Sequence, residues 1–386
     1  GEKSPPKRGG FSAVMRKWQP DGWRLAAIVV SLLVITPLTV IFLSWADYSE
    51  DIWAHLAENM LSELLINTAW LVGGVAAGTA ILGVSLAWVT AVCEFPGRRF
   101  FSWALLLPLA MPTYVLAFVC LGLFDYAGPV QTLARQWFGS SNWLPDMQST
   151  LGVVSVMTIA LYPYVYLLTR NAFITQGKRM LEAAESLGCG PWRAFYKVVL
   201  PMARPWIAGG VMLVLMEALA DFGAVSIFNY DTFTTAIYKA WFGFFSLPTA
   251  AQLASCLVIL VFVIVVIEQK MRSRMRFSEN RQSSTPERIQ LVGKKKWLVF
   301  SYAASVLSIA FILPTIQLLI WVLEVFADEF DGRYLTYLWH SLLLGCLAAI
   351  VIAVMATILS YAARRHPDTG TRTLVRIANL GYALPG

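Results

Sequence analysis

Two acidic residues lie four positions apart within an apolar stretch of this sequence. The segment LMEALADFGAV contains Glu217 and Asp221, and this spacing places both side chains on one face of a helix. Carboxylates at membrane depth are costly and usually face a cavity or a partner, which makes the pair a candidate for a substrate or ion pathway. The alternative is a helix-packing pair that accepts hydrogen bonds from Ser, Tyr or backbone donors. The sequence leaves both interpretations open.

A second polar element, EAAESLGCGPWRAFYKVVLPMARP at 182–205, lies between two apolar runs. Good helix formers precede Gly188, which suits a helix C-terminus because glycine tolerates positive φ. Pro191 is favourable in the first turn of a new helix, and Pro201 and Pro205 are expected to break the helical pattern before the next apolar run. The segment therefore predicts a hairpin of two short helices at the membrane surface.

Two interpretations of this hairpin remain open. An amphipathic pair lying on lipid headgroups explains the aromatic residues beside Arg193 and Lys197. Docking into a protein groove explains the small residues Ala183 and Ala184, because small side chains let another surface approach closely.

The composition indicates which elements position these residues. The chain has 386 residues, of which 58% are hydrophobic and 14% charged, whereas soluble domains are about 25% charged. The apolar residues form runs of about 20, long enough to cross a bilayer as helices, and the short alternating segments of a β-barrel do not occur. We predict an all-α, polytopic helical bundle with spans near 24–46, 66–92, 102–124, 150–169, 205–227, 249–268, 297–325, 339–362 and a ninth starting near 375.

Charge patterning predicts the orientation of these spans. Lys and Arg gather in the N-terminal tail (1–23) and in alternate loops, including the hairpin, while Asp and Glu gather in the intervening loops. The positive-inside rule then places the N-terminus and the hairpin in the cytoplasm. The net charge of +7 thus reflects topology and does not indicate nucleic-acid binding. The first span follows a long charged tail, so we interpret it as a retained helix.

An internal repeat divides the chain. A shift of 273 residues lays the apolar pattern of 66–88 over that of 338–361, and it lays Pro112 over Pro385. The charged segment 269–296 is interpreted as a cytoplasmic linker. We therefore expect a first unit of six spans at 24–268, with its core at about 62–267, and a second unit at 297–386, with its core from about 335. A second copy of the hairpin would lie beyond residue 386, so we expect the second unit to be truncated.

The hairpin resembles the EAA loop of type I ABC-importer permeases, which docks into a separate ATPase. The matching residues are Glu182, Ala183, Ala184, Gly188, Phe195, Leu200 and Pro201. The resemblance implies alternating access in the bacterial inner membrane, two copies of a cytoplasmic ABC ATPase, and a solute-binding protein on the outer side. ATP and Mg are expected on the partner ATPase, because Gly293-Lys294-Lys295 lacks the first Gly and the Ser/Thr of a phosphate-binding loop. We therefore expect no catalytic residues and no bound cofactor in this chain.

A further resemblance concerns the solute. The segment 230–254, together with MEALADFG, resembles the fused ferric-iron permeases. Hard cations prefer carboxylate and phenolate oxygens, although tyrosine also serves packing and interfacial anchoring. Such oxygens are supplied by Glu217, Asp221, Tyr114, Tyr162 and Tyr164. The alternatives are a permease for a polyamine, thiamine or a sulfate-type oxyanion, a proton-coupled secondary transporter, and a membrane sensor or scaffold.

Cysteine and histidine residues give no sign of a metal centre. The five cysteines and three histidines are scattered along the chain, so we expect packing roles for the cysteines and no metal site. The Gly74-xxx-Gly78 spacing permits close helix packing.

Overall fold

The structure is a computed structural model. It describes residues 21–366, apart from 49, 178–183, 185, 187, 274–287, 330 and 331, and then residues 368–380. Within these residues, eight helical segments are long and apolar enough to cross a membrane. This confirms the predicted polytopic helical bundle. The N-terminal residues 1–20 and the end of the predicted ninth span, 381–386, lie outside the described residues.

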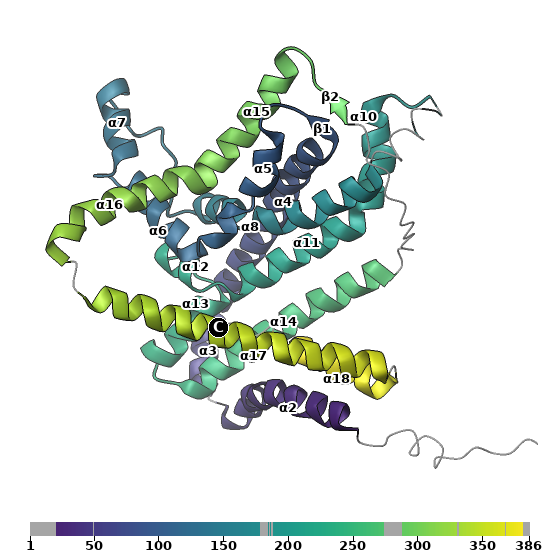
Figure 1. Cartoon of the computed structure of the whole chain (residues 1–386). Coiled ribbons are helices and arrows are strands. Elements are labelled where there is room, and N and C mark those ends of the chain that lie inside the picture. Colours follow the sequence, from purple (N-terminus) through teal and green to yellow (C-terminus); the bar gives the residue numbers. More distant parts are fainter. Residues whose placement is uncertain are drawn as a thin grey trace, which may run out of the picture. The chain divides into compact units, whose positions relative to one another are not determined.

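Helices account for most of the described chain (Figure 1). The α-helices are α2 (Gly22–Leu43), α3 (Glu50–Asn59), α4 (Leu61–Val92), α5 (Arg98–Ala104), α6 (Thr113–Phe124), α7 (Pro129–Phe138), α8 (Thr150–Ala172), α10 (Pro191–Ala194), α11 (Leu200–Ala220), α12 (Gly223–Ile227), α13 (Phe233–Tyr238), α14 (Leu247–Ser273), α15 (Lys294–Leu307), α16 (Leu313–Glu329), α17 (Arg333–Arg365) and α18 (Thr369–Leu380). The shorter elements are the 3-10 helices η1 (Ser44–Asp47) and η2 (Leu107–Ala110), the π-helical turns η3 (Phe173–Gly177), η4 (Phe195–Val199), η5 (Lys239–Gly243) and η6 (Ser308–Ile312), and the strands β1 (Cys93–Glu94) and β2 (Ile289–Gln290).

The chain forms two compact units. One unit consists of α2, α17 and α18, so it combines the first apolar helix with helices encoded about 300 residues later. The other unit covers the helices from Ser44 to Asp328, including α15 and α16 from beyond the linker. Each packing unit therefore contains helices from both sides of the linker. The predicted boundaries of the two sequence repeats stay a prediction.

The helices α4, α8 and α11 pack against one another at the centre of the larger unit (Figure 1). Glycines permit the close approach of α4 and α8: a Cβ on Gly74 would lie 2.8 Å from Val154 Cγ1, and one on Gly78 would lie 2.6 Å from Thr158 Oγ1. The close packing expected from the Gly-xxx-Gly spacing is thus confirmed. The paired positions advance in the same direction along both helices, so α4 and α8 run parallel.

The repeat is visible in helix bounds. A shift of 273 residues moves the ends of α4 to 334 and 365, and α17 runs from 333 to 365. The two helices thus have nearly the same length at equivalent positions, in agreement with a pseudo-repeated bundle.

The prediction that Pro201 and Pro205 end the hairpin helix was wrong. Residues 191–220 are helical throughout, as α10, η4 and α11. A proline lacks the N–H for the i→i−4 bond, and its ring clashes with that carbonyl. The π-helical turn η4 precedes Pro201, and its bond from Leu200 N–H to Phe195 O spans five residues. The same arrangement of η6 precedes Pro314, so a widened turn accommodates each Leu-Pro pair without ending the helix.

Candidate functional site

The hairpin turns at Gly188. This residue has a φ of 80°, and the Cys189 N–H donates to Ala184 O at 2.9 Å. A glycine with positive φ followed by this six-residue bond defines a Schellman C-terminal cap, so the predicted role of Gly188 as a helix cap is confirmed. A Cβ on Gly188 would meet nothing within 4 Å, which means that backbone conformation, and not space, requires glycine here. Glu182 and Ala183 lie outside the described residues.

The second arm of the hairpin starts at Pro191, in the first turn of α10 as predicted, and continues into η4. Its aromatic anchor is Phe195, whose ring centroid lies 4.5 Å from that of Trp88 on α4. Trp88 also packs edge-on against Phe173, at 5.4 Å. The hairpin is therefore fixed to the helix that forms the centre of the bundle. Sequence reasoning missed Trp88, because nothing local in the sequence relates it to residue 195.

The two sides of the hairpin differ in character. The side facing the chain's own core is small and apolar: Ala184 is 4% exposed, Ala194 is fully buried and Val199 is 2% exposed. The opposite side is basic and aromatic, with Arg193, Tyr196, Lys197 and Arg204 exposed.

This orientation corrects one step of the sequence argument. Ala184 permits close approach, but the surface that approaches it is the chain's own helical core. A partner protein would instead meet the basic and aromatic side. Phe195, Leu200 and Pro201 are all partly buried, so these three residues of the motif support the base of the hairpin.

A strand pair joins the end of the linker to the same region. The strand β2 pairs in parallel with β1, with Cys93 opposite Ile289 and Glu94 opposite Gln290. Ile289 also packs against the buried cluster that contains Ala184 and Ala194. The predicted linker thus ends in an ordered contact beside the hairpin. Burial raises the pKa of the Cys93 thiol to about 11, which keeps this thiol protonated at neutral pH.

Glu94 organises the charges at this strand pair. Its carboxylate lies 3.1 Å from Arg98 Nε and 3.6 Å from Arg288 Nη1. Arg98 is 8% exposed and also donates to Thr90 O at 3.3 Å. One acidic side chain therefore holds the buried Arg98 and the linker residue Arg288 together.

The structure brings the predicted acidic residues and tyrosines together. Asp221 immediately follows α11, and its carboxylate accepts hydrogen bonds from the Thr113 hydroxyl and from the Ala224 N–H, the latter at 2.7 Å. The first bond ties Asp221 to the start of α6, and the second satisfies an N–H in the first turn of α12. Asp221 thus has a structural role, and it is still partly exposed.

The other candidate pathway residues surround Asp221. Glu217 interacts electrostatically with both Asp221 and Tyr164, so the spacing of four does place the two carboxylates together. Tyr114 is 52% exposed, and its Cβ lies 2.7 Å from the position that a Cβ on Gly223 would occupy. Whether these residues line a pathway stays a prediction. By contrast, the Tyr162 hydroxyl is buried and donates to Leu105 O at 2.9 Å, which is a packing role.

Thr113 is the residue of this cluster that sequence reasoning missed. It is the first residue of α6, and it is 108 positions from Asp221 in sequence. The available signal was a hydroxyl residue after Pro112 at the start of an apolar helix, which identifies a helix start but not its distant partner.

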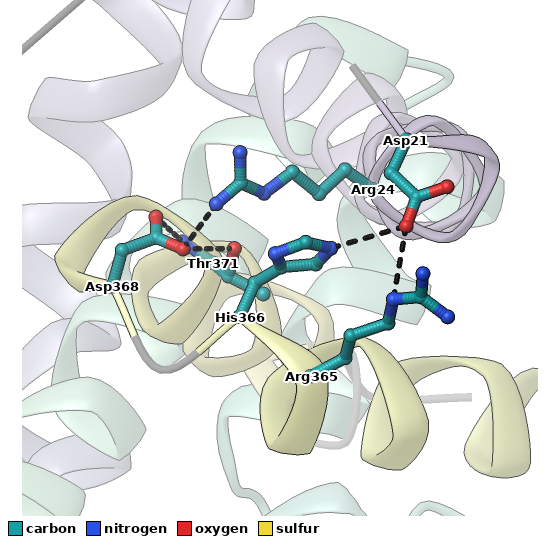
Figure 2. A network of polar contacts seen from close by, with 6 residues as sticks. All are labelled: Asp21, Arg24, Arg365, His366, Asp368 and Thr371. Carbon is teal, nitrogen blue, oxygen red and sulfur yellow. Dashed lines mark hydrogen bonds and ion pairs between the residues drawn. The ribbon is translucent and has the colours of Figure 1, made fainter. Parts of the chain in front are cut away.

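In the smaller unit, α2 is joined to the turn between α17 and α18 by a polar network (Figure 2). Arg24, which is 6% exposed, donates to Asp368 Oδ1 at 2.7 Å. The N–H and hydroxyl of Thr371 both donate to Asp368 at 3.1 Å. Partial burial raises the pKa of Asp368, but these hydrogen bonds together outweigh it and hold the pKa below its ordinary value.

The second half of the network centres on Asp21 (Figure 2). Its Oδ2 lies 3.1 Å from Arg365 Nε and 3.4 Å from His366 Nε2. Acidic and basic side chains thus alternate between the start of α2 and the end of α17. This network attaches α2 near the end of the long helix α17. In the predicted repeat, α4 is the helix equivalent to α17, and Glu94 attaches the linker just after the end of α4.

Within the described ranges, no three His, Cys, Asp or Glu side chains are arranged to hold a metal ion, and the five cysteines are all free. Glu217 and Asp221 thus form a pair of acidic residues, with the Thr113 and Tyr164 hydroxyl groups nearby.

The described chain combines eight candidate membrane spans with a capped surface hairpin. Residues 79–276 match the family of binding-protein-dependent transport system inner membrane components, and the chain belongs to this family.

Curated relatives of this chain include permeases for different solutes. The chain is 28% identical over 331 residues to the Fe(3+)-transport system permease protein FbpB 2 of Haemophilus influenzae, which covers 84% of this chain and 62% of that protein. The chain thus spans less than two thirds of this relative. It is 29% identical over 203 residues to the sulfate transport system permease protein CysT of Escherichia coli K12, which covers 51% and 70% of the two chains.

A solved structure shares the fold. It is the bacterial alginate ABC transporter in complex with an alginate pentasaccharide-bound periplasmic protein, which the chain matches with a TM-score of 0.53 at 16% identity over 68% of this chain and 97% of that one.

Proposed function

We propose that this chain is the permease subunit of an ATP-driven, binding-protein-dependent importer that moves ferric iron across the membrane by alternating access. The observation that carries the proposal is the capped hairpin at residues 184–200, whose apolar side is buried in the bundle and whose basic side is exposed. A hairpin anchored to the bundle in this way would transmit a displacement of its partner to the spanning helices. Family membership and the likeness to FbpB 2 support the same function.

The partners follow from this role. An ABC ATPase, in two copies, would dock on the basic side of the hairpin, and ATP and Mg would be bound by that partner. A solute-binding protein would deliver the substrate on the opposite side of the membrane. The alternation of basic and acidic loops in the sequence supports a cytoplasmic N-terminus. The solved alginate transporter, which is in complex with a periplasmic protein, supports the binding-protein partner.

Ferric iron is favoured over an oxyanion by the charges near the candidate pathway. Glu217 and Asp221 are both carboxylates, and Tyr164 adds a phenol oxygen. Such a set attracts a hard cation and repels sulfate. The match to CysT keeps a sulfate-type oxyanion as the second candidate.

The coupling role is tested with two matched glycine variants, in cells that also make the binding protein and the ATPase. Gly188→Val places a β-branched residue at positive φ, at a cost of roughly 1–2 kcal/mol in the turn. Gly190→Val makes the same change two residues later, where φ is not positive and a Cβ also meets nothing within 4 Å. We expect ATP-dependent uptake to fall in the first variant and to persist in the second, at equal membrane levels. Equal uptake by both variants would refute the coupling role of the hairpin.

The substrate is tested separately, by comparing uptake of radiolabelled ferric iron and sulfate in the parent and in Glu217→Gln. We expect the parent to take up iron, and the variant to lose iron uptake while retaining ATPase binding. Sulfate uptake without iron uptake would assign the oxyanion instead. Uptake that survives ATP depletion but stops when the proton gradient is dissipated would identify a secondary transporter.

A further inference from the structure

The helix α7 presents its polar side to the chain and its apolar side to the surroundings. The Gln131 amide donates to Phe124 O at 2.8 Å, and Arg135 donates to Tyr126 O at 2.6 Å. The Arg135 guanidinium also lies over the Tyr126 ring, 4.2 Å from its centroid. Gln131 and Arg135 are thus engaged within the loop that carries the helix. A surface helix of a soluble protein has the opposite orientation, with its apolar stripe toward the core.

The outward side of α7 is large and apolar. Leu133 and Trp137, one helical turn apart, are 48% and 77% exposed, and Phe138 is 68% exposed. Trp143 extends this surface beyond the helix: it is 62% exposed, and its ring packs edge-on against Phe138 at 5.7 Å. Four large apolar side chains therefore form one continuous exposed surface, and water is an unfavourable environment for it.

The loop holds α7 beside the end of a membrane helix. The α6 helix ends at Phe124 and α7 begins at Pro129. The connection folds back closely, because a Cβ on Gly128 would lie 2.4 Å from Gly122 O, within α6. The α8 span then begins at Thr150. The candidate span Thr113–Phe138 includes both α6 and α7, and Thr150–Thr175 is the next one. The break at 125–128 separates α7 from α6, so α7 lies between the end of one membrane helix and the start of the next.

We propose that α7 lies in the plane of the bilayer interface, with the side chains of Leu133, Trp137, Phe138 and Trp143 inserted among the lipids. Tryptophan and other amphipathic aromatic residues concentrate at this depth, and an apolar helix side that is parallel to the membrane is stabilised there. The single charged residue of α7, Arg135, is engaged with Tyr126, so the helix offers no free charge to steer a protein partner.

The proposal is independent of the transported solute and predicts a specific pattern of solvent access. The full chain, with its native cysteines replaced by serine, is reconstituted in phosphatidylcholine–phosphatidylglycerol vesicles. A fluorescent thiol label is attached at Trp137→Cys or, as the matched control, at the neighbouring exposed position Gln136→Cys. Nitroxide-labelled lipid then reports contact with acyl chains, and aqueous iodide reports contact with water.

We expect nitroxide lipid to quench the label at 137 at least about twofold more than the label at 136, and iodide to show the reverse order. Leu133→Cys is the second variant, and it should behave as position 137 does. Strong iodide quenching at 133 and 137 would overturn the proposal, because the surface would then face water. Protection from both quenchers would also overturn it, because a protein would then cover α7.

Discussion

Gly210 offers a direct test of the packing between α8 and α11. A Cβ at this position would lie 2.7 Å from Val165 Cα and 3.3 Å from Tyr164 O, whereas ordinary carbon contacts are about 3.5–4.0 Å. Both obstacles are backbone atoms, so in Gly210→Ala the two helices must separate by roughly 1 Å. Overpacking of this kind costs about 1–3 kcal/mol. Replacing a helical glycine by alanine also gains up to about 1 kcal/mol in helix propensity.

Gly73→Ala is the matched control, because it makes the same change in α4 where a Cβ would meet nothing within 4 Å. The propensity gain is common to both variants, so their difference isolates the packing cost. The free energy of unfolding is measured by titrating the purified full chain in mixed micelles with SDS, followed by circular dichroism. We expect Gly210→Ala to be less stable than Gly73→Ala by about 1–3 kcal/mol. Equal stability of the two variants would refute the close approach of α8 and α11.

Three further perturbations test the polar contacts. Glu94→Gln should weaken the hold of residue 94 on Arg288 of the linker, and we expect faster proteolysis within the linker, whereas an unchanged rate would show that the strand pair holds without the charge. Thr113→Val should destabilise the chain by about 1–2 kcal/mol in the same SDS titration, because it removes a donor to Asp221, and Thr113→Ser should restore most of the loss. The pKa of Asp368 is lowered in the folded state, so its contribution is present above its ordinary pKa and disappears as the pH falls through the lowered value. Asp368→Asn should remove this acid-dependent loss of stability.

Local chemistry explains which features could be predicted from the sequence. The hairpin turn was predictable at Gly188, because positive φ favours glycine, and Pro191 marks the start of the next arm in the same way. The spacing of Glu217 and Asp221 likewise fixed their common helical side. In each case the residues that decide the structure lie within a few positions of one another.

The features that could not be predicted depend on distant partners. Ala184 is small enough to approach any surface, and only the fold shows that it faces its own core. Pro201 ends a regular α-helix, but the π-helical turn η4 offers an alternative that composition does not reveal. The pairing of Glu94 with the linker joins residues almost 200 positions apart, so neither side carries a local signal of the other.

The contact between Arg24 and Asp368 determines when the helix α2 can be packed during synthesis of the chain. These residues are 344 positions apart, and a ribosome adds about 5–20 residues per second. The helix α2 is therefore synthesised roughly 17–70 s before its ion-pair partner exists. By contrast, Phe300 on α15 meets Phe101, to which it packs at 5.5 Å, as soon as it is synthesised. The helix α2 is thus packed only after α17 and α18 have been made, and a nascent chain stalled before residue 368 would leave α2 without these partners and open to membrane quality control.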